Sequence, residues 1–77
     1  MRLYEGEIGK TYEVEDMHMP LETERRMEAL GMTRKTSVTV MNKKRRGAMV
    51  IKLRGTRFAL GEEILKSIQV REVESHA

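Results

Sequence analysis

Residues 38–60 read VTVMNKKRRGAMVIKLRGTRFAL, and this stretch decides the fold. Val38 and Val40 alternate with Thr39 and Met41, which is typical of a strand with one buried face. The basic run 42–47 separates this strand from the mostly apolar segment 48–53. Gly55 marks a tight break before a third short strand that ends the stretch, so we predict two consecutive hairpins.

The same period-two alternation continues on both sides of this stretch. It predicts a first strand over residues 10–15 and a last strand over residues 68–70. Between the first two strands, Pro20 suits the first position of a helix, which we expect to end at Leu30. Gly31 is placed to close that helix in a left-handed conformation. Residues 61–67 are too short for an independent helix and predict one helical turn.

Short strands, tight turns and one small helix favour a mainly β fold, a small barrel of about five strands that curls to bury its apolar face. The 77 residues support one core, so we expect a single domain over residues 1–77 with a frayed tail from about residue 73. The expected core consists of Met27, Leu30, Val38, Val40, Ile51, Leu53, Phe58, Leu60, Ile68 and Val70.

Composition narrows the range of functions. The chain has no cysteine, which removes disulfides, thiolate metal sites and a cysteine nucleophile. It has no membrane-span pattern and no signal-peptide pattern, so we expect a cytoplasmic protein. No Ser, His and Asp set is arranged for nucleophilic catalysis, and no glycine-rich phosphate loop precedes a helix. We therefore expect no enzymatic activity.

Charge is segregated along the sequence. No acidic residue lies between Arg34 and Gly61, although the window holds nine basic residues and the whole chain has a net charge of only +3. The run Lys43 to Arg46 is dense enough to bind nucleic acid or an acidic protein, although a charged hairpin tip can also be simply solvated. The candidate partner-binding residues are Arg34, Lys35, Lys43, Lys44, Arg45, Arg46 and Arg57.

One short segment carries metal-binding residue types. Asp16 and His18 offer a carboxylate and an imidazole that suit a transition metal ion such as Fe²⁺, bound weakly. No second histidine lies at helical spacing, and an ordinary loop histidine explains His18 equally well. Met17 between them is expected to be exposed enough for an adaptable contact surface, whereas Met27 and Met32 are expected to fill the core.

Three segments together resemble a known family. They are RMEALGM at 26–32, VTV at 38–40 and RGTRFAL at 54–60, and this combination is similar to the FeoA family, the small cytosolic component of ferrous iron transport. The most specific positions are Leu30, Gly31, Gly55 and Leu60. The resemblance covers residues from about 4 to 70 and implies an SH3-like barrel with an inserted helix.

The resemblance also implies a function without chemistry of its own. A FeoA-like protein needs no cofactor and binds the large membrane permease with its cytosolic nucleotide-binding domain. It is at most peripheral at the inner face of the membrane, through that partner. Lys35, Gly61 and the pair Ala48-Met49 depart from common family residues, so contacts through the basic tip are not transferred from the family.

Three hypotheses follow. The leading one is a non-enzymatic accessory protein of ferrous iron uptake that binds the permease and regulates it. The first alternative is a small basic nucleic-acid-binding barrel, indicated by the cationic window. The second is a metal-responsive module that uses Asp16 and His18. Exposed strand edges also offer contacts for a homodimer.

Overall fold

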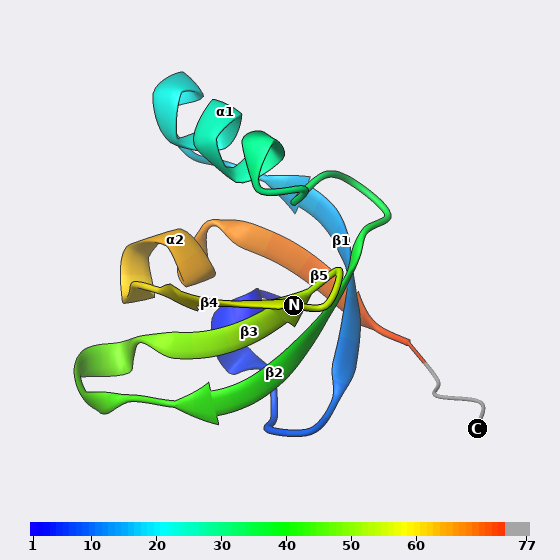
Figure 1. Cartoon of the computed structure of the whole chain (residues 1–77). Helices are drawn as coiled ribbons and strands as arrows, with labels where there is room; N and C mark the ends of the chain where they lie inside the picture. Colours follow the sequence, from blue (N-terminus) through cyan, green and yellow to red (C-terminus); the bar gives the residue numbers. More distant parts are fainter. Residues whose placement is uncertain (74–77) are drawn as a thin grey trace.

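The computed structural model describes residues 1–73. Its elements follow in chain order, where η denotes a 3₁₀ turn: η1 (Leu3–Glu5), β1 (Thr11–Met17), α1 (Leu21–Ala29), β2 (Ser37–Lys43), η2 (Arg45–Gly47), β3 (Met49–Leu53), β4 (Thr56–Leu60), α2 (Glu62–Lys66) and β5 (Ile68–Glu72) (Figure 1). The predicted strands and both helical segments are confirmed. The predicted tail falls almost entirely outside the described residues.

The strands form one antiparallel sheet in the order β4-β3-β2-β1-β5. Register shifts at Glu15 in β1 and Met41 in β2 add a residue to each strand, and such bulges bend a sheet strongly. The N-terminus lies against β5, since Arg2 bridges Gln69. This mainly β domain with its curled sheet matches the small β fold predicted from the residue pattern, and it is consistent with the SH3-like architecture that the family resemblance implies.

The β3–β4 hairpin closes through a two-residue turn, as expected for the break at Gly55. Arg54 and Gly55 both have positive φ angles, 51° and 81°, which is the geometry of the tight turns that match strand twist. Leu53 pairs with Thr56 across this turn, and Leu60 pairs with Met49 at the far end of the hairpin.

Helix α1 ends in the predicted glycine cap. Gly31 has φ of 101°, and its N–H donates to the Glu28 carbonyl at 2.9 Å. The Met32 N–H donates to the Met27 carbonyl, also at 2.9 Å, so the chain folds back over the last helical turn. Met27 and Met32 are both buried, and Met27 is the only buried residue of α1. The helix is therefore attached to the barrel mainly through this methionine pair.

Three predictions about the burial of individual side chains are wrong. Leu30 is 38% exposed, because it occupies the C-cap, outside the face that Met27 buries. Phe58 is only partly buried, since it lies on the edge strand β4. Met17, expected to be exposed, is 9% exposed, because the strand it ends extends beneath α1.

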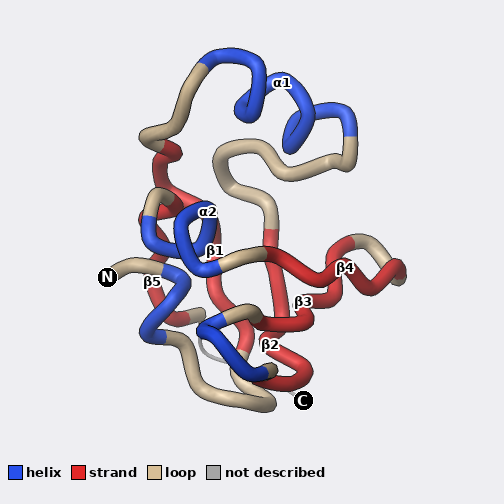
Figure 2. Tube along the Cα trace, turned by 90° about the vertical axis from the view of Figure 1, so that its left-hand side faces the viewer, coloured by secondary structure: helices blue, strands red, loops and turns tan. Residues whose placement is uncertain are grey.

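Leu3 and Leu65 are fully buried and were absent from the predicted core. They lie on the short helical segments η1 and α2, where alternation gives no signal. Helix α1 lies at one end of the barrel, and the β2–β3 connection with η2 lies at the other (Figures 1 and 2). Of the helices described within residues 1–73, none is long and apolar enough to cross a membrane.

Candidate functional site

The predicted partner-binding cations do not form one patch. Strand β2 separates Lys35 from Lys43, and its 7 residues span about 23 Å at the usual rise per residue. Arg57 lies between the two groups on β4, opposite Lys52 of β3. The candidate cations come from one acid-free window of the sequence, but the fold divides them between two ends of the barrel. The two ends have different surroundings.

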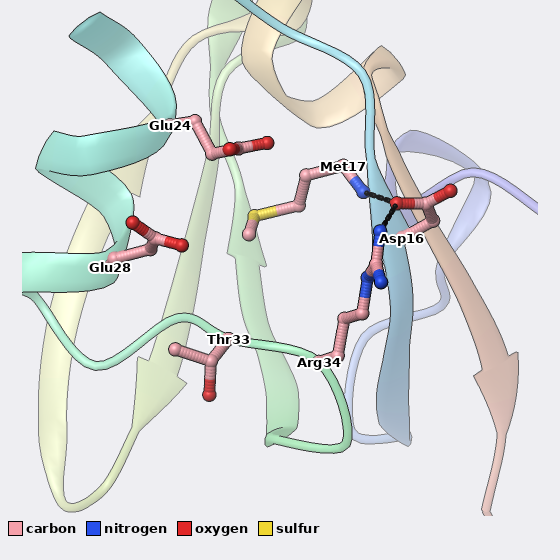
Figure 3. Close-up of a pocket in the computed structure, with 6 residues that line it drawn as sticks. All are labelled: Asp16, Met17, Glu24, Glu28, Thr33 and Arg34. Atoms are coloured by element: carbon pink, nitrogen blue, oxygen red, sulfur yellow. Dashed lines mark hydrogen bonds and ion pairs between the residues drawn. The ribbon is translucent and has the colours of Figure 1, made fainter. Parts of the chain in front are cut away.

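Near α1, a groove separates the helix from β1. Its volume is about 290 Å³, and its lining residues are Asp16, Met17, Glu24, Glu28, Thr33 and Arg34 (Figure 3). Figure 3 shows the two glutamates on the helix wall, facing the methionine, with the Asp16–Arg34 pair on the opposite side. We call this the acidic groove, because three carboxylates and one cation line it.

Asp16 is held by its neighbours within this groove. Its Oδ1 accepts hydrogen bonds from the Met17 N–H and from the Arg34 guanidinium, each at 2.9 Å. The Met17 N–H and then Arg34 lower the pKa of Asp16, because both stabilise the carboxylate. Arg34 therefore shares its charge with an internal acid and is less available to an outside partner than the sequence suggests.

The two predicted metal ligands do come together. His18 Nε2 lies 3.4 Å from Asp16 Oδ2. Within residues 1–73, however, no group of three or more His, Cys, Asp or Glu side chains converges on a possible metal position. The pair alone gives too few donors for a closed transition-metal site, and Asp16 already accepts two hydrogen bonds. Metal binding by Asp16 and His18 therefore remains a prediction, with two candidate ligands in place.

The chain after α1 forms a second feature, which we call the α1 corner, residues 30–35 together with Arg54. Arg54 was not among the candidate partner-binding residues, yet its side chain lies against Gly31, where a Cβ would be 3.3 Å from Arg54 Cδ. Lys35 is exposed and has φ of 70°, and its N–H donates to the Val14 carbonyl at 2.7 Å. Exposed Leu30 thus precedes a turn that Arg54 contacts at Gly31.

At the other end, residues 43–47 form the tip of the β2–β3 hairpin. Its four cations, Lys43, Lys44, Arg45 and Arg46, are all exposed. Arg46 has a left-handed conformation with φ of 64°, and the Lys44 N–H donates to the Ala48 carbonyl at 2.7 Å, which closes the loop. None of these cations has an ion-pair partner within residues 1–73.

A polar network supports the base of the tip. The Tyr4 hydroxyl donates to Glu62 Oε1 at 2.9 Å, and Lys66 Nζ lies 3.7 Å from the same oxygen and 4.9 Å from the centre of the Tyr4 ring. Acceptance of this hydrogen bond by Glu62 raises the pKa of Tyr4. A Cβ at Gly47 would lie 2.7 Å from Glu62 Oε1, so only glycine fits there without movement of that carboxylate.

The network also borders a second groove, of about 290 Å³, lined by Tyr4, Lys43, Lys44, Gly47, Ala48 and Met49. This arrangement was not among the predicted sites. Its members come from η1, α2 and the hairpin, and 58 positions separate Tyr4 from Glu62. No local motif in the sequence connects them.

Comparison with known proteins identifies a family and a fold. The FeoA domain model matches residues 1–72. A crystal structure of an iron uptake regulatory protein, FeoA, is similar with a TM-score of 0.86 and 22% identity over 95% of this chain and 97% of that chain. The solution structure of the FeoA protein from Chlorobium tepidum has a TM-score of 0.90 and 20% identity over 100% of this chain and 74% of that chain.

A more distant group shares the fold. A manganese-dependent transcriptional repressor has a TM-score of 0.86 and 16% identity over 95% of this chain, but the match covers only 41% of the repressor. At these identities the structural similarities show a common fold. No curated protein sequence is significantly similar to this chain.

Proposed function

This chain belongs to the FeoA family, which is involved in ferrous iron transport, and on that premise we propose that it is a non-enzymatic accessory protein that binds the cytosolic part of the ferrous iron permease and regulates it. The observation that carries the proposal is the extent of the family match. It covers residues 1–72 of a chain of 77 residues.

The α1 corner supports a binding role. Leu30 is 38% exposed, and the α1 corner to which it belongs also holds the exposed cations Lys35 and Arg54. An apolar side chain with a basic surround suits a partner surface that offers an apolar contact among carboxylates. Since these charges are exposed, salt should weaken the contact. The protein would then act in the cytoplasm, peripheral to the membrane through its partner.

A titration with the purified cytosolic domain of the permease tests this proposal. Calorimetry at low and at physiological salt should show binding that weakens as salt rises. The variant Lys35→Gln/Arg54→Gln should reduce the affinity about ten-fold or more, because it removes two corner cations. The tip variant Lys44→Gln/Arg45→Gln is the matched control, with the same loss of charge at the other end of the barrel.

The relative affinities of the two variants show whether the permease domain binds the α1 corner or the tip. A larger loss in the tip variant than in the corner variant would move the contact to the tip, where Lys43 to Arg46 lie. Absence of any binding at low salt would contradict the proposal. Ultracentrifugation of the free protein checks the homodimer alternative, since β4 is an edge strand of the sheet, whereas Met1 and Arg2 cover part of the β5 edge.

The alternatives have tests of their own. A filter-binding assay with duplex DNA and with RNA measures the nucleic-acid hypothesis, which requires an affinity that falls steeply with salt. Anaerobic calorimetry with Fe²⁺, on the parent protein and on His18→Ala, measures the metal-responsive hypothesis. An identical heat trace for the two proteins would remove His18 from that hypothesis.

A further inference from the structure

We propose that the end of the barrel away from α1 binds anionic lipid bilayers directly, through the tip cations Lys43 to Arg46 and the exposed side chain of Ile8. This goes beyond the proposed function, because the surface needs no protein partner to bind. The occupant is the negatively charged headgroup layer of a membrane. Three features of the structure carry the proposal.

The first feature is the concentration of uncompensated charge. Four consecutive cations lie at one hairpin tip, and none has an ion-pair partner within residues 1–73. Two acids near this end are already engaged. Glu62 is bound by Tyr4 and Lys66, and Glu7 lies 3.0 Å from Lys10. The tip therefore presents a net positive field to its surroundings.

The second feature is an apolar side chain at the same end. Ile8 is 56% exposed on the loop between η1 and β1. The Gly9 N–H donates to the Val40 carbonyl of β2 at 2.8 Å, and the Lys10 N–H donates to the Glu7 carbonyl at 3.1 Å, so the loop is held in place. Figures 1 and 2 both show this loop and the tip at the end opposite α1.

The combination is typical of a surface that binds the interface of a bilayer. Cations near an anionic membrane contribute attraction that reaches about one Debye length, and an exposed aliphatic side chain adds apolar burial among the headgroups. A single exposed isoleucine is ordinary on a protein surface, and Ile8 bears on membrane binding because its loop lies at the same end of the barrel as the tip cations. The cations and Ile8 can both contribute to binding only if the membrane surface contacts the tip and the loop at the same time.

The third feature distinguishes a bilayer from nucleic acid. The tip is a projecting end of a hairpin, whereas a nucleic-acid strand is usually bound along a groove with aromatic side chains for base stacking. Tyr4, which borders the groove beside Lys43 and Lys44, has its hydroxyl bound to Glu62 and its ring covered by Lys66. The described tip residues include no aromatic side chain.

Vesicle flotation with the full chain tests the proposal. The probes are vesicles of phosphatidylcholine alone and vesicles with about one third phosphatidylglycerol, at low salt. We expect binding to the anionic vesicles only. The variant Lys43→Gln/Lys44→Gln/Arg45→Gln/Arg46→Gln should bind at least a hundred-fold more weakly, since each cation near the surface contributes roughly five-fold.

The matched control removes four cations elsewhere, as Lys35→Gln/Lys52→Gln/Arg54→Gln/Arg57→Gln. It has the same net charge as the tip variant, so a response to overall charge would weaken both proteins equally, and that result would overturn the proposal. We expect the control to lose less than about ten-fold. The variant Lys43→Arg/Lys44→Arg keeps the charge and should bind like the parent protein, which separates charge from a folding defect.

Ile8→Ser measures the apolar contribution. It should weaken binding several-fold, and this loss should persist at high salt, where the contribution of the cations is screened. Failure of the parent protein to bind anionic vesicles at low salt would overturn the proposal, and so would tighter binding to duplex DNA than to the vesicles. Because pure lipid contains no permease, these outcomes are independent of the titration that tests the proposed function.

Discussion

Arg34 near α1 and Arg45 at the β2–β3 tip are both exposed arginines from the same acid-free window of sequence, yet their surroundings differ. Arg34 donates to Asp16 at 2.9 Å, in a groove with two further carboxylates. Arg45 has no ion-pair partner within residues 1–73. A count of charges along the sequence therefore overestimates the unpaired positive charge near α1. At the β2–β3 tip the same count is accurate.

The two ends also differ in packing. The α1 end depends on Met27 and Met32, which attach a separate helix to the barrel. The tip extends from two strands that are already paired in the sheet. We therefore expect substitutions of buried residues near α1 to lower stability, and substitutions of the exposed tip cations to leave stability nearly unchanged.

The largest effect on stability should come from Met27→Ala. It removes the only buried side chain of α1, and large-to-small changes of this kind cost about 2–5 kcal/mol. The free energy of unfolding of a domain of this size is roughly 4–12 kcal/mol, so this substitution should remove a large part of the total stability. Urea unfolding followed by circular dichroism measures it. A change below about 1 kcal/mol would show that α1 is held by contacts other than the methionine pair.

Gly31→Ala should have the next largest effect. The position has φ of 101°, where an L-residue costs roughly 1–2 kcal/mol, and the new Cβ would lie 3.3 Å from Arg54 Cδ. Gly61→Ala is the control, because Gly61 has φ of −75° and a Cβ added there would meet no atom within 4 Å. Equal destabilisation of the two variants, measured by urea unfolding, would argue against the left-handed cap as the cause.

Asp16→Asn should change how stability depends on pH. The pKa of Asp16 is lowered in the folded protein, so its contribution is present above its ordinary value of 3.8 and is lost as pH falls through the lowered pKa. The parent protein should therefore lose stability on acidification below about pH 4 more steeply than the variant. Urea midpoints measured from pH 7 down to pH 2 give the comparison.

Glu24→Gln is the control for that experiment. It removes the same charge from the same groove, but Glu24 has no ion pair within residues 1–73. It should keep the acid dependence of the parent protein. Arg34→Gln should remove only part of the dependence, because the Met17 N–H still donates to Asp16. A parent-like pH profile in Asp16→Asn would contradict the assignment.

The smallest effect on stability should come from Lys44→Gln/Arg45→Gln. Exposed substitutions away from packed features change stability little, so the melting temperature should stay within about 2 °C of the parent value. Any rise in melting temperature should appear at low salt, because the variant has less repulsion among neighbouring cations. The rise should vanish at high salt, which screens that repulsion in the parent protein. Thermal unfolding at two salt concentrations measures both. A marked loss would show that the tip is a structural element.

Most of the fold could be predicted from sequence because its signals are local. Alternation located the strands, Gly31 and Gly55 marked the tight turns, and Pro20 marked the start of α1. Core positions on the short helical segments could not be found in this way. Leu3 and Leu65 belong to elements of only 3 and 5 residues, too short for a periodic pattern.

The sequence alone determined a small, mainly β fold and the charge segregation, because periodicity, turn residues and composition are properties of neighbouring positions. The SH3-like assignment was implied by the resemblance to the FeoA family. Only the tertiary structure decided how that charge is used. Folding brings Asp16 to Arg34, Arg54 to the end of α1, and Glu62 beneath the tip, while Lys43 to Arg46 gain no acidic partner within residues 1–73. Such pairings join residues distant in the chain, and electrostatic attraction depends on distance in space.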